Sequence, residues 1–302
     1  MATMLQNIQD VCLELGLSSP SAVASNTDET VVQLLALMNR VGITLSTEHD
    51  WQSLSAEYRF ETVFYQYTGD VTEGSTTISN LSSVVGLSTD FMVSGTGIMQ
   101  DTFITSVGAD SVTLNIASTS TATSQTFTFG QVKYSMPSDF ARIVNKTQYN
   151  KSNRWSVIGP KDAQEWQWLK ASYVTTGPRM RFRMIGDKFT LWPMPASNLV
   201  MGFEYVSKNW AVAAAGTGKA KLTADDDTVL YPDALLILGT KLKWFEIKGF
   251  DTTTLFADYQ RELSKWKAAE AGADTLSLAP QYANILLTQN NIPDSGYGNT
   301  TS

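Results

Sequence analysis

Residues 112–129 read VTLNIASTSTATSQTFTF and belong to a longer stretch, residues 68–129, that contains no Lys, Arg, Pro or His. Serine and threonine supply 25 of its 62 residues, and short runs alternate apolar with small polar side chains. Glycine and aspartate separate these runs, as turns separate strands. Disordered linkers share such a composition, but the regularly placed Ile, Val, Leu and Phe argue against one. The stretch therefore predicts an inserted β-module, a small sandwich or barrel.

The segment before this module is predicted to be helical. Residues 4–16 place apolar side chains on one helical face, and Gly16 is a typical helix end. Asn26 and Glu29 form a variant capping box, which predicts a second helix that ends at Gly42.

The segment after the module mixes strands and helices. Residues 179–192, RMRFRMIGDKFTLW, alternate strictly around a Gly-Asp turn and predict a β-hairpin. A helix is expected over residues 162–172, and two more are expected over 232–248 and 253–271, each followed by a glycine.

Together these patterns predict an α+β protein. A helical-bundle core and a β-hairpin region would carry an inserted all-β domain, sandwich-like or barrel-like, and an extended C-terminal tail. The expected boundaries are 1–67 for the first part of the core, 68–130 for the β-domain, 131–272 for the second part of the core, and 273–302 for the tail.

Composition limits the possible functions. The chain has one Cys, one His and a formal charge of −7, which argues against Cys-cluster metal sites, histidine-based catalytic triads and wholesale nucleic-acid binding. The charge is uneven, because residues 131–190 carry a net +7 while residues 1–130 carry −11. Opposite poles can drive head-to-tail association, and a mixed solvated surface is the alternative.

No catalytic, cofactor or metal motif is complete. The Gly216–Ala220 segment lacks the first glycine and the Ser/Thr of a phosphate-binding loop, and the aspartates at 225–227 lack the glycine and glutamate of a calcium loop. His49 lies beside carboxylates but has no second imidazole or thiolate nearby in sequence. We therefore expect no enzyme activity, no cofactor and no metal.

The strongest polar pattern is the alternation of arginine with apolar residues in the hairpin. A nucleic-acid platform or a half-exposed strand with a basic face would both show it. Contacts between subunits could use the arginines of the hairpin and the aspartate run, namely Arg179, Arg181, Arg183, Asp225, Asp226 and Asp227.

The order of several segments resembles the head-to-tail adaptor, or connector, proteins of podovirus-like tailed bacteriophages. These segments are DWQSL at 50–54, YSMPSDFARI at 134–143, GDKFTLWP at 186–193, FEYV at 203–206 and DDT at 226–228 before a Leu-rich helix. The resemblance covers most of residues 27–272 apart from the Ser/Thr-rich insert, and neither the insert nor the tail is part of it.

The resemblance implies a structural virion protein at the head–tail junction, made in the cytoplasm of the host bacterium. Such adaptors form a ring, typically of twelve copies, that joins the portal protein to the tail nozzle and can contact tail fibres. Double-stranded DNA passes through the ring without sequence-specific binding. A tail component that binds glycans, receptors or fibres is the alternative.

In this family the C-terminal segment commonly extends onto the portal. The tail of this chain carries apolar side chains that suit such docking. They are Leu276, Leu278, Tyr282, Ile285, Leu286, Leu287 and Ile292.

Overall fold

A computed structural model describes residues 2–159, 162–171, 180–195 and 197–271. These residues form a mixed α+β protein that divides into two compact units. The first, called the helical unit, takes residues 2–56, 139–144 and 205–271, and the second, called the strand unit, takes most of 57–138 and 145–204.

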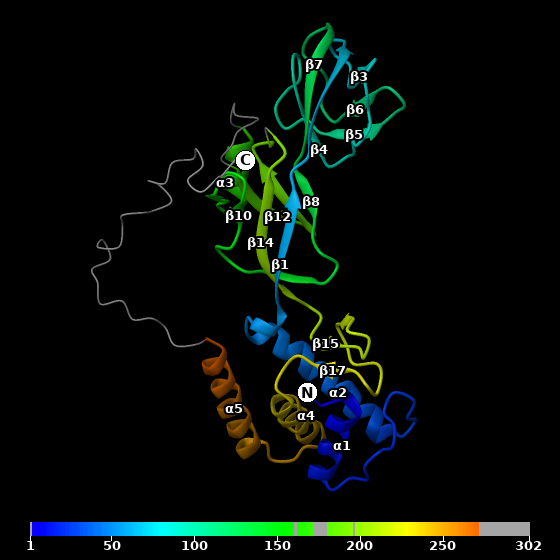
Figure 1. Cartoon of the computed structure of the whole chain (residues 1–302), viewed down its shortest axis with the longest axis vertical. Coiled ribbons are helices and arrows are strands. Elements are labelled where there is room, and N and C mark those ends of the chain that lie inside the picture. Colours follow the sequence, from blue (N-terminus) through cyan, green and yellow to red (C-terminus); the bar gives the residue numbers. More distant parts are fainter. Residues whose placement is uncertain (1, 160–161, 172–179, 196, 272–302) are drawn as a thin grey trace, which may run out of the picture. The chain divides into compact units, whose positions relative to one another are not determined.

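The helical unit is built around four helices (Figure 1). They are α1 (Met4–Leu15), α2 (Glu29–Glu48), α4 (Asp233–Lys248) and α5 (Thr253–Ala271). Helix α4 contacts the other three, and one apolar core runs between them. A short helix η1 (Gln52–Leu54) and a small sheet complete the unit, with β15 (Ala211–Val212) lying between β16 (Gly218–Lys219) and β17 (Thr228–Val229).

The ends of α1 and α4 confirm the sequence prediction. Gly16 and Gly249 follow the two helices with φ angles of 70° and 75°, the left-handed conformation that favours glycine. At the start of α1, Thr3 and Gln6 form a capping box, with each side chain accepting a hydrogen bond from the other residue's backbone N–H.

The predicted limits of the second helix are wrong at both ends. Asp28, and not Asn26, caps α2, because its carboxylate accepts hydrogen bonds from the N–H groups of Thr30 and Val31. The helix also continues past Gly42 to Glu48. A Cβ on Gly42 would lie 2.3 Å from the indole ring of Trp210, so close packing, and not a helix end, requires glycine here.

The strand unit contains a six-stranded antiparallel sheet from the predicted module region. Its order is β4 (Phe91–Ser94), β7 (Ala122–Gln131), β2 (Phe64–Val71), β3 (Thr77–Ser79), β6 (Val112–Leu114) and β5 (Ile104–Val107). The two edge strands meet through a bridge between Met92 and Phe103, so the sheet curls onto itself. Phe127 and Phe129, from the stretch quoted first, are fully buried inside it.

Two further sheets combine strands from the chain before and after these strands. One has the order β12 (Arg181–Ile185), β13 (Lys188–Trp192) and β8 (Lys133–Ser135). The other has the order β1 (Ser55–Glu61), β14 (Val200–Ser207), β10 (Tyr149–Asn150) and β11 (Trp155–Ser156), with β9 (Phe140–Ile143) also on β14. Helix α3 (Ala163–Lys170) begins after the N-cap Asp162.

The hairpin is confirmed, whereas the strand before the module was missed. In the hairpin β12 pairs with β13 so that Ile185 faces Lys188 across a turn in which Gly186 has a φ of 63°. Residues 57–67, expected in the helical core, instead form most of β1 and the start of β2 in the strand unit.

The six-stranded sheet shares a buried cluster with the rest of the strand unit. Met92 of β4 packs with Trp166 of α3 and with Trp192 near the end of the hairpin. Two ion pairs reinforce this contact, Lys170 with Asp101 at 2.7 Å and Lys188 with Asp90 at 2.6 Å. The sheet is therefore packed against the hairpin and α3 within one unit.

Candidate functional site

The arginine hairpin presents two different faces. Phe182 is fully buried and stacks on Phe189, with ring centroids 4.7 Å apart, while Arg181 and Arg183 are half-buried on the opposite side of the strand. The alternation seen in the sequence therefore separates an aromatic core face from a basic face. Arg179, the third arginine of the predicted set, lies outside the described residues.

The aspartate run serves mainly to fold the loop before α4. Asp225 accepts hydrogen bonds from the N–H groups of Val23 and Ala24, at 2.9 and 2.8 Å. Asp227 is fully buried and accepts from Lys219 Nζ and from the backbone of the loop. Only Asp226 of the three is exposed. Two of the three predicted contact aspartates thus have partners within their own chain.

Lys219 and the loop backbone also set the charge state of Asp227. Burial alone would raise the pKa of this carboxyl, but hydrogen bonds from Lys219, Thr223 N and Ala224 N outweigh it and hold the pKa below its usual value. Asp227 is therefore a structural anion near neutral pH.

The positive segment, residues 131–190, is partly neutralised inside the chain. Four of its cations pair with carboxylates from the acidic first 130 residues. The pairs are Arg142–Asp50, Lys151–Glu57, Lys170–Asp101 and Lys188–Asp90. The positive and negative segments inferred from the sequence therefore partly pair with each other within one subunit. The linear order of the residues does not show this pairing.

Arg142 also closes the end of α2. Its guanidinium donates to the carbonyl oxygens of Ser46 and His49, at 2.9 and 2.8 Å, and to Asp50 Oδ1. A cation at a helix C-terminus compensates the unsatisfied carbonyls there. His49 follows the last residue of the helix and packs edge-on against Trp51, with ring centroids 5.2 Å apart.

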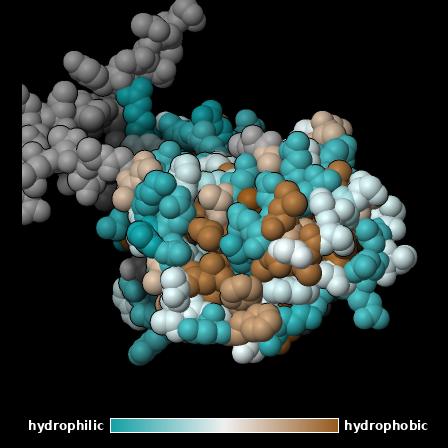
Figure 2. Space-filling model, turned by 90° about the horizontal axis from the view of Figure 1, so that it is seen from below, coloured by the Kyte–Doolittle hydropathy of each residue, from teal (hydrophilic) through white to brown (hydrophobic). Residues whose placement is uncertain are grey.

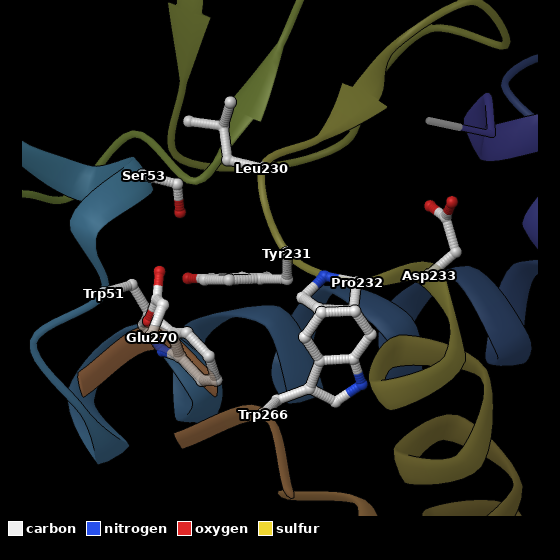
Figure 3. A pocket seen from close by; sticks show the side chains of 8 residues that line it. All are labelled: Trp51, Ser53, Leu230, Tyr231, Pro232, Asp233, Trp266 and Glu270. Carbon is white, nitrogen blue, oxygen red and sulfur yellow. The ribbon is translucent and has the colours of Figure 1, made fainter. Parts of the chain in front are cut away.

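A pocket of about 310 Å³ opens beside this turn in the helical unit (Figure 3). Its aromatic walls are Trp51, Tyr231 and Trp266, and Glu270 of α5 lies at one side. Gln52 ties the end of α5 to the turn, because its N–H and its side-chain amide donate to Glu270 Oε1 and to the Glu270 carbonyl. Nothing in the sequence pattern pointed to this pocket, since its walls come from three distant segments.

The helical unit also exposes apolar side chains. Seen from below, apolar groups gather on one face of the molecule (Figure 2). The large exposed apolar residues of this unit are Leu13, Val32, Ile43, Ile247, Phe250 and Phe256. Phe250 follows the end of α4, and its N–H donates to the Phe245 carbonyl. Contiguous apolar patches, more than single exposed apolar side chains, are typical of surfaces that contact other proteins.

Other expected sites lie outside the described residues or find no match there. The apolar tail, from Leu276 to Ile292, lies outside the described residues. Within the described part of the chain, no group of three or more His, Cys, Asp or Glu is arranged to hold a metal ion. In the same residues, no helix has the length and apolar character needed to span a membrane.

Comparison with known proteins identifies a family for this chain. No curated protein matches the chain. The sequence pattern of the family described as "SU10 adaptor protein" matches residues 99–285, more than half of the chain. The match includes the arginine hairpin, the aspartate run and helices α3, α4 and α5. This protein therefore belongs to the SU10 adaptor protein family of bacteriophage structural proteins.

Proposed function

We propose that this adaptor is a virion protein of the head–tail junction, where a ring of typically twelve copies joins the portal to the tail nozzle around the DNA exit channel. The family match over residues 99–285 carries the proposal. The exposed apolar side chains of the helical unit support it, because an adaptor needs surfaces for several neighbouring proteins.

The ion pairs within the chain fit a role in which DNA passes without sequence-specific binding. Tight binding of a duplex requires many phosphate contacts from lysine and arginine. In this chain Lys151, Lys170 and Lys188 of the most basic segment already have carboxylate partners. Their charges are balanced locally, which favours a surface along which a duplex can move.

Two further parts of the proposal concern segments with separate roles. We propose that residues 276–292 dock on the portal, as the apolar side chains of this tail suggest. We also propose that residues 68–130 form an insertion that contacts neighbouring subunits or tail fibres, since they lie mostly within a sheet of their own.

Native mass spectrometry of the full chain with the portal protein of the same phage tests the ring. We expect twelve adaptor copies on each portal ring. Failure to load the portal would contradict the proposal and would favour the alternative of a glycan-binding or fibre-binding tail component.

A pair of deletions tests the docking tail. Removing residues 276–302 should abolish portal loading without changing the urea unfolding of the remaining chain. Removing only residues 294–302, which read DSGYGNTTS, should leave loading intact because all the apolar residues proposed to dock remain. Full loading by the longer deletion would refute the docking role.

A further inference from the structure

The C-terminal end of α5 is held against the turn that follows α2. Gln52 donates from its N–H to Glu270 Oε1 at 3.0 Å and from its side-chain amide to the Glu270 carbonyl at 2.7 Å. One turn earlier on α5, Lys267 pairs with Glu48 of α2 at 2.9 Å. Two separate contacts therefore fasten the last turn of α5 to residues 48–52 of the helical unit.

One oxygen of Glu270 lacks a donor in this contact. Glu270 Oε2 is shielded from water and accepts no hydrogen bond from the described residues. His49 Nε2 lies 3.7 Å from it, beyond the distance of about 3.2 Å that limits an ordinary N–H···O hydrogen bond. A buried acceptor without a donor is unfavourable, so a stronger attraction between these two side chains would stabilise the end of α5.

Protonation changes what the His49 ring can offer to Glu270. A neutral imidazole has one N–H group and one acceptor nitrogen, whereas an imidazolium donates from both nitrogens and carries a positive charge. A charged donor forms a shorter and stronger hydrogen bond to a carboxylate than a neutral one does. Histidine side chains ordinarily gain this proton between about pH 8 and pH 5, where carboxylates ordinarily stay ionised. The side chain of His49 is 29% exposed, so solvent protons can reach it.

The other charged groups around this pair are already engaged. The charged and titratable groups on the surrounding elements are Glu48 of α2, Asp50 of the turn, Arg142 of β9, Lys267 of α5, and Tyr231 and Asp233 at the start of α4. Glu48 pairs with Lys267, and Asp50 pairs with Arg142.

The two groups at the start of α4 also have partners. Asp233 accepts hydrogen bonds from Ala2 N and from the Asn7 side chain, and the Tyr231 hydroxyl donates to the Gly42 carbonyl at 3.3 Å. Among the carboxylates of this described region, Glu270 alone has a buried oxygen without a donor. A proton gained by His49 therefore acts on Glu270.

We propose that His49 and Glu270 form a pH-dependent clasp that holds the end of α5 against the turn after α2. When the ring is protonated, Nε2–H donates to Glu270 Oε2 and the last turn of α5 is held most firmly. As the pH rises and the ring loses this proton, the added stabilisation is lost and the contacts of Gln52 and Lys267 remain. The chain has a single histidine, so no other side chain ordinarily titrates in the same range.

The clasp lies where the C-terminal tail begins. Residues 272–302 follow directly from α5, and its consequence for the tail rests on the proposed function, in which residues 276–292 dock on the portal. A fixed starting point reduces the conformational entropy that the tail loses when it docks. We therefore expect the chain to load on the portal more tightly at the lower pH, where the clasp is closed.

Hydrogen exchange of the full chain, corrected for the intrinsic effect of pH on amide exchange, tests the clasp. The amides of residues 264–271 should be about threefold better protected at about pH 5.5 than at about pH 7.5, the gain of a partly exposed ion pair. His49→Gln and Glu270→Gln should each remove this pH dependence, because neither variant can form the charged pair. Glu270→Gln keeps a side-chain oxygen that can accept from Gln52 N, so the rest of the contact is preserved.

Asp258→Asn is the matched control for Glu270→Gln. It makes the same change from carboxylate to amide on α5, where Asp258 pairs with Arg261, and it should keep the wild-type pH dependence. Equal protection of the wild type at both pH values would overturn the clasp. A pH dependence that survives unchanged in Glu270→Gln, or that disappears in Asp258→Asn, would overturn it as well. Urea unfolding checks each variant, and Glu270→Gln still decides the question if His49→Gln does not fold.

Loading on the portal separates this inference from the proposed function. A chain that shows the exchange signal but never loads on the portal refutes the proposed function and leaves the clasp standing. A chain that loads although the exchange of its α5 end ignores pH refutes the clasp and leaves the function standing. If both stand, half-loading should need about threefold less wild-type chain at the lower pH, with no such change in His49→Gln; half-loading of the wild type that ignores pH would refute the link between clasp and tail.

Discussion

Replacing Gly42 with alanine is expected to destabilise the helical unit, although the same change stabilises most helices. Gly42 lies within α2, where alanine is favoured over glycine by about 1 kcal/mol. However, a Cβ at this position would lie 2.3, 2.4 and 2.6 Å from three ring carbons of Trp210. Trp210 is fully buried and stacks against Tyr231, so its ring cannot move aside freely.

The magnitude follows from the two opposing effects. Overpacking a core typically costs about 1–3 kcal/mol, and contacts this short place Gly42→Ala in the upper part of that range. Subtracting the gain in helix propensity leaves a net loss of about 1–2 kcal/mol in the free energy of unfolding.

Urea unfolding followed by tryptophan fluorescence measures this loss. Ala36→Gly on the exposed face of α2 is the control for helix propensity, with an expected loss of about 1 kcal/mol. In a double variant, Trp210→Leu should relieve the clash, so the two changes together should cost less than the sum of each alone. A Gly42→Ala variant that is more stable than the wild type would refute the packing argument.

Three further changes test other features of the fold. Asp227→Asn should destabilise the chain most near neutral pH. Because the folded pKa of Asp227 lies below the unfolded value of about 3.9, the carboxylate stabilises the fold fully above that value, and this stabilisation is lost as the pH falls through the folded pKa. A difference in the free energy of unfolding between variant and wild type that does not change with pH in urea titrations would contradict this. Arg142→Met should lower the free energy of unfolding by about 1–2 kcal/mol, because two carbonyls at the end of α2 lose their donor; unfolding at the wild-type urea midpoint would show that the contacts contribute nothing. Met92→Ala should cost about 2–4 kcal/mol because Met92 is fully buried where the six-stranded sheet meets α3; the exposed Met99→Ala is its control, and equal effects of the two would argue against that cluster.

Local signals in the sequence predicted much of the secondary structure. The glycines after α1 and α4 end those helices, and the Gly186 turn and the flanking alternation produce the hairpin. Each of these features depends on neighbours within a few residues, where propensity and turn chemistry act directly. The phage adaptor family was likewise recognised from the order of short motifs along the chain.

Features that depend on distant partners could not be predicted in this way. Gly42 has the appearance of a helix end, but its role is set by Trp210, which is 168 residues away in sequence. Residues 57–61 carry alternating aromatic and charged side chains that were not recognised as a strand. Tertiary packing overrides local preference at such positions.

By itself, the sequence determined the α+β class, the ends of α1 and α4 and the hairpin, because short-range periodicity and turn residues encode them, and the order of its short motifs indicated the phage adaptor family. Only the tertiary structure decided how the charges are used. It pairs Lys170 and Lys188 with acids from the first half of the chain, buries Asp227, and assembles the pocket around Glu270 from separate segments. Coulombic and packing energies depend on distance in space, and folding brings together groups that the sequence keeps far apart.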